Sequence, residues 1–246
     1  MTMQDQLVVI TGGATGIGWA LAAALSPANT VVSLDRNPAS SAALRASLPA
    51  VVSLRADVTD PAQLAAALAA VARDYGRIDL LIHNAGVGGP VDVRAQPEAA
   101  LMAALKAEID TNYLAPIRLT KLALPLLEAS ARPRVLFITS GLAYVPIAAF
   151  GGYCASKAAA HFFAMSLRQQ LRGSRIEVVE ALPPTVATRF NENQPDIPKM
   201  APDVYARKLL RALAAGRPVI RVGQSAVLEK LARLAPGLAF RLLNRG

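Results

Sequence analysis

The chain has 246 residues, of which 53% are hydrophobic and 17% are charged, and its formal net charge is +9. This composition excludes a disordered protein, and no apolar run approaches the ~18–20 uncharged residues that span a bilayer. The single cysteine, Cys154, excludes an internal disulfide. The start MTMQDQLVVI has no signal-peptide pattern, so we expect a cytoplasmic protein.

Short runs rich in Val, Ile and Leu recur along the chain, separated by Ala/Leu-rich segments with helical periodicity. Nearly continuous apolar strands that alternate with helices are typical of a parallel sheet covered on both faces. We therefore predict an α/β fold in one domain, 1–246, with a single doubly wound, Rossmann-type sheet of about seven strands. The expected strands are Leu7–Thr11, 31–35, Val51–Arg55, 78–83, 135–140, 176–182 and 219–222.

A glycine-rich turn follows the first expected strand and opens the first helix. Its pattern is Thr-Gly-x-x-x-Gly-Ile-Gly, and it lacks the Lys-Ser/Thr pair of a phosphate-binding P-loop, which argues against ATP or GTP. Glycines allow close approach of a pyrophosphate at a helix N-terminus. Taken alone, the pattern fits an ordinary turn equally well. The candidate cofactor residues in this loop are Gly12, Thr15, Gly16, Ile17 and Gly18.

Asp35 ends the second expected strand, where a carboxylate can accept both ribose hydroxyls of an adenosine. It would repel a 2′-phosphate, so we expect NAD rather than NADP. The neighbouring Arg36 keeps NADP open, because its guanidinium can pair with a 2′-phosphate. The next two strand ends add five candidate cofactor contacts: Asp57, Val58, Asn84, Ala85 and Gly86.

Tyr153 and Lys157 are four residues apart in an expected helix and so share a face. A nearby ammonium favours the phenolate, so we expect Lys157 to lower the pKa of Tyr153 and make it an acid–base catalyst. Ser140, at the end of the fifth strand, can bond the same substrate oxygen. Asn112 can hold a water beside Lys157.

Taken together, these motifs resemble the short-chain dehydrogenases/reductases with chains near 250 residues. The resemblance runs from Leu7 to about Thr188. It implies a catalytic tetrad, bonding of the nicotinamide ribose by Lys157, hydride transfer to or from a carbonyl, and a homodimer or homotetramer. The implied tetrad consists of Asn112, Ser140, Tyr153 and Lys157. The further cofactor contacts are Pro183, Val186 and Thr188.

Two positions depart from the family pattern. His83 stands where the family usually has Asn, and we interpret it as a structural histidine. Pro184 stands where the family has Gly, which removes a backbone donor near the nicotinamide. The double proline, the lid and the tail look like a branch named for a protein linked to D-alanyl esterification of teichoic acid. We do not infer that activity.

A polar, proline-rich segment, 189–202, follows the sixth strand and is predicted to be a substrate lid. With the loop after Ser140 it would form an apolar pocket for a medium-sized alcohol or ketone, and its candidate substrate contacts are Leu142, Tyr144 and Phe150. We interpret Cys154 as a packed thiol and His161 as a core or subunit contact. With so few His and Cys residues, we predict no metal site.

The C-terminal segment is predicted to form a basic amphipathic helix over 225–244. Residues 203–246 carry nine of the 26 Lys and Arg residues but only two acids, Asp203 and Glu229. Packing on the core or on a second subunit is favoured over an anionic membrane surface, and nucleic acid is disfavoured because no aromatic residues interleave with the charges. The alternative to an enzyme is a dinucleotide-binding sensor or scaffold that holds a partner through this tail.

Overall fold

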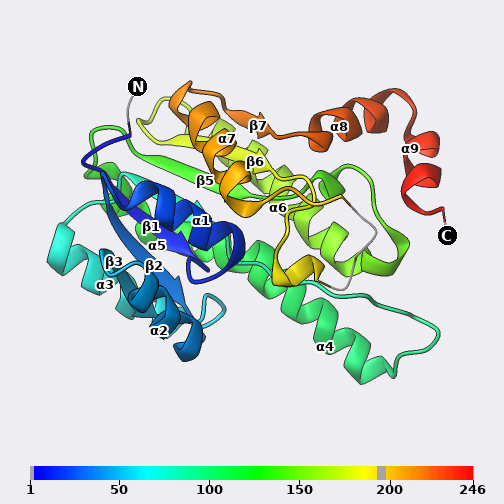
Figure 1. The fold of residues 1–246 in the computed structure, drawn as a ribbon, viewed down its shortest axis with the longest axis horizontal. Helices are drawn as coiled ribbons and strands as arrows, with labels where there is room; N and C mark the ends of the chain where they lie inside the picture. Colours follow the sequence, from blue (N-terminus) through cyan, green and yellow to red (C-terminus); the bar gives the residue numbers. More distant parts are fainter. Residues whose placement is uncertain (1–2, 193–197, 246) are drawn as a thin grey trace.

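The computed structural model describes residues 3–192 and 198–245. Its centre is a sheet of seven parallel strands in the order β3-β2-β1-β4-β5-β6-β7 (Figure 1). This confirms the predicted fold class, and the order reverses direction between β1 and β4, where an open sheet offers a crevice for ligands. The strands are β1 (Leu7–Thr11), β2 (Thr30–Asp35), β3 (Val51–Arg55), β4 (Leu80–His83), β5 (Arg134–Ile138), β6 (Glu177–Leu182) and β7 (Val219–Arg221).

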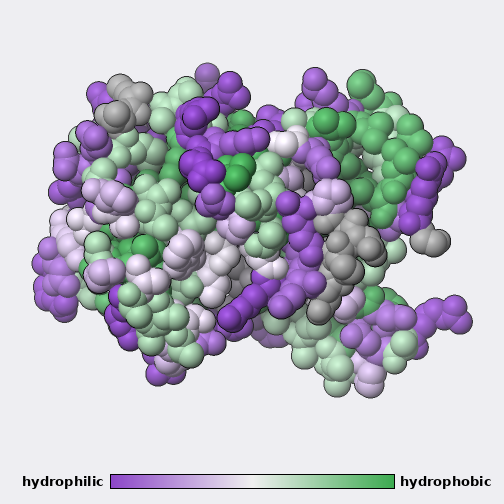
Figure 2. Space-filling model, in the orientation of Figure 1, coloured by the Kyte–Doolittle hydropathy of each residue, from purple (hydrophilic) through white to green (hydrophobic). Residues whose placement is uncertain are grey.

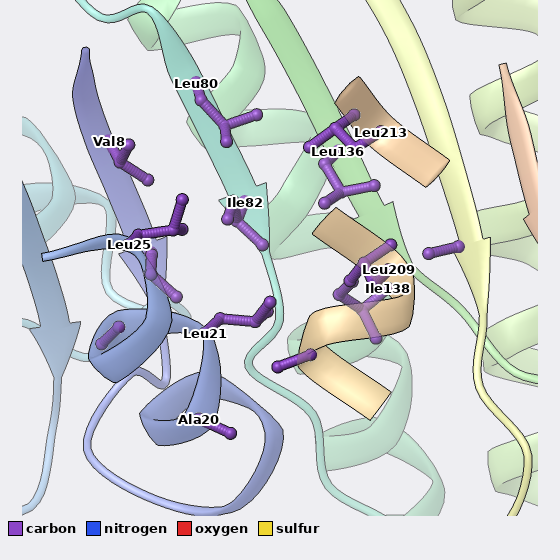
Figure 3. Close-up of a cluster of buried hydrophobic side chains, with 14 of the residues drawn as sticks. Val8, Ala20, Leu21, Leu25, Leu80, Ile82, Leu136, Ile138, Leu209 and Leu213 are labelled. Atoms are coloured by element: carbon purple, nitrogen blue, oxygen red, sulfur yellow. The ribbon is translucent and has the colours of Figure 1, made fainter. Parts of the chain in front are cut away.

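Helices cover both faces of the sheet, which explains why the strands are apolar throughout rather than alternating. Figure 3 shows one face, where Leu21 and Leu25 from α1 and Leu209 from α7 pack against strand residues such as Val8 and Ile82. Helices α3, α5 and α6 cover the other face. The helices are α1 (Gly16–Leu25), α2 (Pro38–Ser47), α3 (Pro61–Tyr75), α4 (Glu98–Ile109), α5 (Ala115–Glu128), α6 (Gly151–Gln170), α7 (Pro202–Ala214), α8 (Gln224–Leu234) and α9 (Pro236–Leu243).

Helix α3 shows how local sequence sets an element's ends. The carboxylate of Asp60 accepts hydrogen bonds from the backbone N–H groups of Ala62 (2.9 Å) and Gln63 (3.1 Å), and Pro61 occupies the first turn. The helix ends at Gly76, whose φ of +71° is the left-handed conformation that glycine adopts readily.

Two features differ from the sequence prediction. The C-terminal segment is not one helix over 225–244 but two, because Pro236 cannot continue the hydrogen bonding of α8 and instead starts α9. Between α4 and α5 the chain widens into a π-helical turn, η1 (Asp110–Leu114), which the periodicity gave no sign of. None of the helices in the described parts of the chain is long and apolar enough to cross a membrane.

Candidate active site

A cavity of about 1000 Å³ lies at the carboxyl ends of the strands. It brings together residues that follow each of the seven strands, in the place where the crevice rule for doubly wound sheets puts a ligand. Most of the predicted site residues line it: Gly12, Thr15, Gly16, Ile17, Asp35, Arg36, Asp57, Val58, Asn84, Ala85, Gly86, Ser140, Leu142, Phe150, Tyr153, Lys157, Pro183, Val186 and Thr188.

The cavity wall formed by the first loop suits a phosphate group. Thr15 precedes α1 with extended backbone and makes no side-chain capping bond. The Thr15 side chain therefore does not bond the first backbone N–H groups of α1. Gly16 has φ +56°, and a side chain there would meet Thr188 at 3.0 Å. Bare amide donors at a helix N-terminus beside a glycine fit the pyrophosphate of a dinucleotide.

Gly18 is the one predicted cofactor residue that does not line the cavity. A Cβ at Gly18 would lie only 2.1 Å from the Gly12 carbonyl oxygen and 2.6 Å from the Asn84 amide nitrogen. Gly18 therefore lets α1 pack directly under the loop. The same loop is tied to β4, because the Asn84 side chain donates to the carbonyls of Thr11 (3.1 Å) and Gly12 (3.0 Å).

At the adenine end, Asp35 is buried and already bonded to its own chain. Its carboxylate accepts from the Ala14 backbone N–H at 3.1 Å and from the Ser33 hydroxyl. Burial raises the pKa of Asp35, and these two hydrogen bonds oppose the rise. Arg36 extends outward with its side chain 63% exposed and pairs with Asp57 at 3.7 Å. Asp35 and Arg36 thus both line the end of the cavity where we expect the adenosine part of the cofactor.

Ser140, Tyr153 and Lys157 meet at the other end of the cavity. The Lys157 ammonium is buried, donates to the Ile138 carbonyl at 3.0 Å and lies 5.8 Å from the centre of the Tyr153 ring. β5 ends at Ile138, two residues earlier than expected, so Ser140 stands beyond the strand and faces the cavity.

The expected lowering of the Tyr153 pKa by Lys157 is wrong for the chain by itself. Burial raises the pKa of Tyr153 to about 12, and hydrogen bonding with Ser140 only partly offsets this. Burial also lowers the pKa of Lys157 to about 8. Desolvation disfavours both charged forms, so Tyr153 is a protonated phenol at neutral pH.

Asn112 does not line the cavity, but it lies close to Lys157: a Cβ at Gly86 would be 3.3 Å from the Asn112 amide oxygen and 3.4 Å from the Lys157 ammonium nitrogen. It sits in η1, where its amide nitrogen donates to the Val87 carbonyl (2.7 Å) and the Ser156 hydroxyl (2.9 Å). Its amide oxygen accepts from the Val87 backbone N–H at 2.9 Å. Through these bonds the Asn112 side chain fixes the segment around Val87 to α6, and its amide oxygen stays close to Lys157.

Tyr144 is the third predicted residue that does not line the cavity. Its ring packs edge-on against His161, with centroids 5.0 Å apart, on the side of a buried polar cluster. There the His161 ring contacts the Glu180 carboxylate at 2.9 Å. Burial, followed by the negative charge of Glu180, raises the pKa of Tyr144. Tyr144 therefore belongs to the packing behind the site.

His83 and Cys154 have the structural environments that we expected. The His83 ring bonds the Thr120 hydroxyl at 2.7 Å and lies 4.7 Å from the Phe137 ring. Burial lowers the pKa of His83 to about 3. Cys154 is buried, and its sulfur accepts from the Ile147 backbone N–H at 3.5 Å, while burial raises the pKa of the thiol.

Sequence reasoning missed two residues beside Tyr153. The Phe190 ring covers the Tyr153 ring, with centroids 4.8 Å apart and an angle of 44° between planes. Phe190 belongs to the segment predicted as a lid; of that segment, 193–197 lie outside the described residues, and Met200 bridges back to Val186. Gly88 lies against both rings, because a Cβ there would be 2.6 Å from Tyr153 and 2.8 Å from Phe190.

Glu108 was also missed, since a lone glutamate in an Ala-rich helix gives no signal. It is buried in α4, and one carboxylate oxygen accepts from the Gly89 backbone N–H at 2.9 Å. Burial raises the pKa of Glu108, and that hydrogen bond opposes the rise. The carboxyl also adjoins Gly152, so it connects the loop over Tyr153 with the start of α6.

Comparisons with known proteins agree with this geometry. Residues 6–198 match the family described as short chain dehydrogenase. The chain is 36% identical to the uncharacterized oxidoreductase DltE of Bacillus subtilis, over 80% of this chain and 77% of that protein. A short chain dehydrogenase from Burkholderia cenocepacia in complex with NADP has 27% identity and a TM-score of 0.85, covering 99% of both chains. A relative from Burkholderia phymatum in complex with NAD has 20% identity and a TM-score of 0.84, covering 96% of this chain and 95% of that one.

Proposed function

The chain belongs to the short-chain dehydrogenase family, and from that premise we propose that it transfers a hydride between NAD(P) and a secondary alcohol or its ketone. One observation carries the proposal: Ser140, Tyr153 and Lys157 line the same cavity as the glycine-rich cradle of α1. A bound nicotinamide cofactor would supply or accept the hydride.

The chain's own residues would handle the proton and the substrate oxygen. In reduction, the protonated Tyr153 donates its phenolic proton to the oxygen of the former carbonyl, and Ser140 donates a hydrogen bond to the same atom. Lys157 places a positive charge close to the phenol, which stabilises the phenolate that forms. In oxidation, Tyr153 has to be a phenolate first, and its pKa of about 12 opposes that.

We further propose NAD as the preferred cofactor. Asp35 lines the cavity and would repel a 2′-phosphate, whereas Arg36 is engaged by Asp57 at 3.7 Å. Titration of the purified protein with NADH and NADPH, followed by cofactor fluorescence, tests this preference. We expect Asp35→Ala to weaken NADH binding and improve NADPH binding. Tighter binding of NADPH than of NADH by the unmodified protein would reverse the proposal.

The substrate is proposed to be a medium-sized apolar alcohol or ketone. The part of the cavity beyond Tyr153 is lined mainly by apolar side chains from three segments: the loop after Ser140, the segment around Phe190, and helices α8 and α9. A panel of ketones of increasing chain length is the direct test. We expect kcat/KM to rise with apolar length until the cavity is filled.

Catalysis itself is tested by Tyr153→Phe, which removes one hydroxyl. We expect kcat to fall about 10²–10⁴-fold while NADH still binds, because only the proton donor is lost. Tyr144→Phe removes the same group from a tyrosine outside the cavity and is the matched control. Full activity of Tyr153→Phe would overturn the mechanism. NADH binding with no turnover of any ketone would favour the alternative, a dinucleotide-binding sensor.

The homodimer or homotetramer implied by the family resemblance is also a proposal. Exposed apolar residues on η1, α5 and α6 support it, since they form surface that a second copy can bury: Leu114, Leu122, Phe162 and Met165. Light scattering of the eluted protein measures the mass directly. We expect Phe162→Glu to shift the mass toward that of one chain, and a single-chain mass for the unmodified protein would contradict the proposal.

A further inference from the structure

The C-terminal helix pair, α8 and α9 (224–243), presents an apolar surface that nothing in the described chain covers. Five of its large apolar side chains are exposed: Val227 (67%), Leu234 (85%), Leu238 (39%), Phe240 (45%) and Leu242 (43%). Figure 2 shows hydrophobic residues gathered at this end of the molecule, with hydrophilic residues along their border. The packing on the core favoured by the sequence therefore does not account for this stripe.

The pair is fastened to the substrate end of the cavity at both of its ends. At the start of α8, the buried Ser225 hydroxyl donates to the Leu182 carbonyl at the end of β6 (2.7 Å). After α9, the Asn244 side chain accepts from the Ala148 backbone N–H (2.6 Å) and donates to the Pro146 carbonyl (3.1 Å). The pair is thus held across the loop that follows Ser140.

The exposed apolar side chains reach the cavity. Val227 and Leu242 line it, and their exposed fractions of 67% and 43% include the surface that faces it. Leu228 and Leu231 continue the lining further in. Apolar side chains of the pair therefore line the same cavity as Tyr153.

Charge distinguishes the possible occupants of the stripe. Between residues 225 and 245 the basic residues Lys230, Arg233, Arg241 and Arg245 face a single acid, Glu229. Glu229 is already paired with Arg233 at 2.8 Å and with Arg221. A second copy docked here would bring two strongly basic segments together, whereas an anionic lipid surface would neutralise them.

We propose that α8 and α9 dock on an anionic lipid surface, with the apolar stripe in the headgroup boundary and the basic residues on the phosphates. The pair has features of helices that lie in an interface: exposed apolar side chains with Lys and Arg among them. Resting on the function proposed above, this geometry gives an amphiphilic ketone or alcohol a direct path from the lipid into the cavity.

Docking is measured without any substrate, by cosedimentation of the purified full chain with vesicles. We expect binding to vesicles of phosphatidylcholine mixed with phosphatidylglycerol, weaker binding to phosphatidylcholine alone, and loss of binding as salt rises. The double variant Leu234→Glu/Leu238→Glu should lose binding at least tenfold. Its matched control, Val93→Glu/Met102→Glu, changes two other exposed apolar residues and should bind as the unmodified chain does.

A second pair of variants separates local docking from overall charge. Lys230→Glu/Arg241→Glu should weaken binding at least tenfold, since each cation near the surface contributes about fivefold. Lys208→Glu/Arg211→Glu makes the same charge change on α7 and should weaken binding much less. Thermal melting verifies that all four variants fold. Equal losses in both charge variants would overturn the proposal, and so would no vesicle binding by the unmodified chain.

Two further outcomes are informative. If Leu234→Glu/Leu238→Glu lowers the mass in solution and no vesicles are bound, the stripe is an interface between copies and the proposal fails. If docking holds, the same variant should lower kcat/KM for a ketone dissolved in vesicles but not for a short, water-soluble ketone. A protein that docks but reduces no ketone would keep the docking proposal and reject the proposed function.

Discussion

The loop that opens α1 and the C-terminal helix pair line the same cavity, but they are built in different ways. The loop is held by close backbone packing: a Cβ at Gly18 would lie 2.1 Å from the Gly12 carbonyl oxygen, and the Asn84 side chain ties the loop to β4. The helix pair is held at its two ends by Ser225 and Asn244, and its apolar side chains stay exposed.

This difference corresponds to two tasks: the loop is suited to cofactor binding, and the helix pair is suited to substrate binding. A dinucleotide requires backbone N–H groups at fixed positions, so the loop tolerates few residue types. A substrate pocket needs only apolar surface of suitable shape, which many combinations of Leu, Val and Phe can provide. Substitutions should therefore have large effects in the first region and its supporting core, and small effects in the second.

The largest contrast is expected between a buried and an exposed leucine of the C-terminal third. Leu209 of α7 is fully buried against the sheet, so Leu209→Ala should lower the free energy of unfolding by about 2–5 kcal/mol. Leu234→Ala removes the same atoms from a side chain that is 85% exposed and should change it by less than about 0.5 kcal/mol. Urea unfolding measures both, and a large loss in Leu234→Ala would show that the helix pair is covered.

Two glycines compare the two regions directly. Gly18→Ala drives a Cβ into the Gly12 carbonyl, and we expect a loss of about 1–3 kcal/mol in stability together with weaker NADH binding. Gly237→Ala in α9 meets no atom within 4 Å and should leave NADH binding unchanged. Urea unfolding and NADH titration give the two readings. Normal NADH binding by Gly18→Ala would mean that the loop is adaptable after all.

The pH dependence of stability that comes from His83 tests whether water is excluded from the region beneath the cofactor loop. Burial lowers the pKa of His83 from 6.5 to about 3, so between these values the unfolded chain holds a proton that the folded chain does not. Stability present above pH 6.5 is therefore lost as the pH falls, by about 2 kcal/mol between pH 7 and pH 5 from this group. His83→Asn should lose correspondingly less over that interval in urea unfolding. Equal losses in both proteins would show that water reaches the His83 ring.

The same difference explains how much could be predicted from the sequence. The strands could be predicted from their apolar runs. The cofactor loop could be predicted from its glycines and from the polar residues at the strand ends, because the backbone geometry there requires those residue types. Gly18 was predicted to contact the cofactor and Asn112 to hold a water beside Lys157, yet neither residue lines the cavity. Spacing alone cannot separate a residue that contacts a ligand from one that supports the contact.

Other features depend on tertiary packing and left no local signal. The pKa of Tyr153 is raised by burial under segments that are distant in the sequence. The sequence showed only Lys157, one helical turn away, and therefore predicted a lowered pKa. Tyr144 turns away from the cavity toward His161, although its neighbour Leu142 lines it. Phe190 reaches Tyr153 from a loop 37 residues further on, a contact that only the fold creates.

Phe190 offers the finest test, because it joins the substrate region to the catalytic tyrosine. Its ring lies 4.8 Å from that of Tyr153, and aromatic contacts of this kind contribute about 0.5–1.5 kcal/mol. Phe190→Ala should therefore raise KM for an apolar ketone about 2–10-fold, with a smaller change in the Kd for NADH. Met102→Ala, at an apolar residue of α4 that is 53% exposed, is the control and should leave KM unchanged. If Phe190→Ala instead weakened NADH binding and left KM unchanged, Phe190 would contribute to the binding of the cofactor and not to that of the substrate.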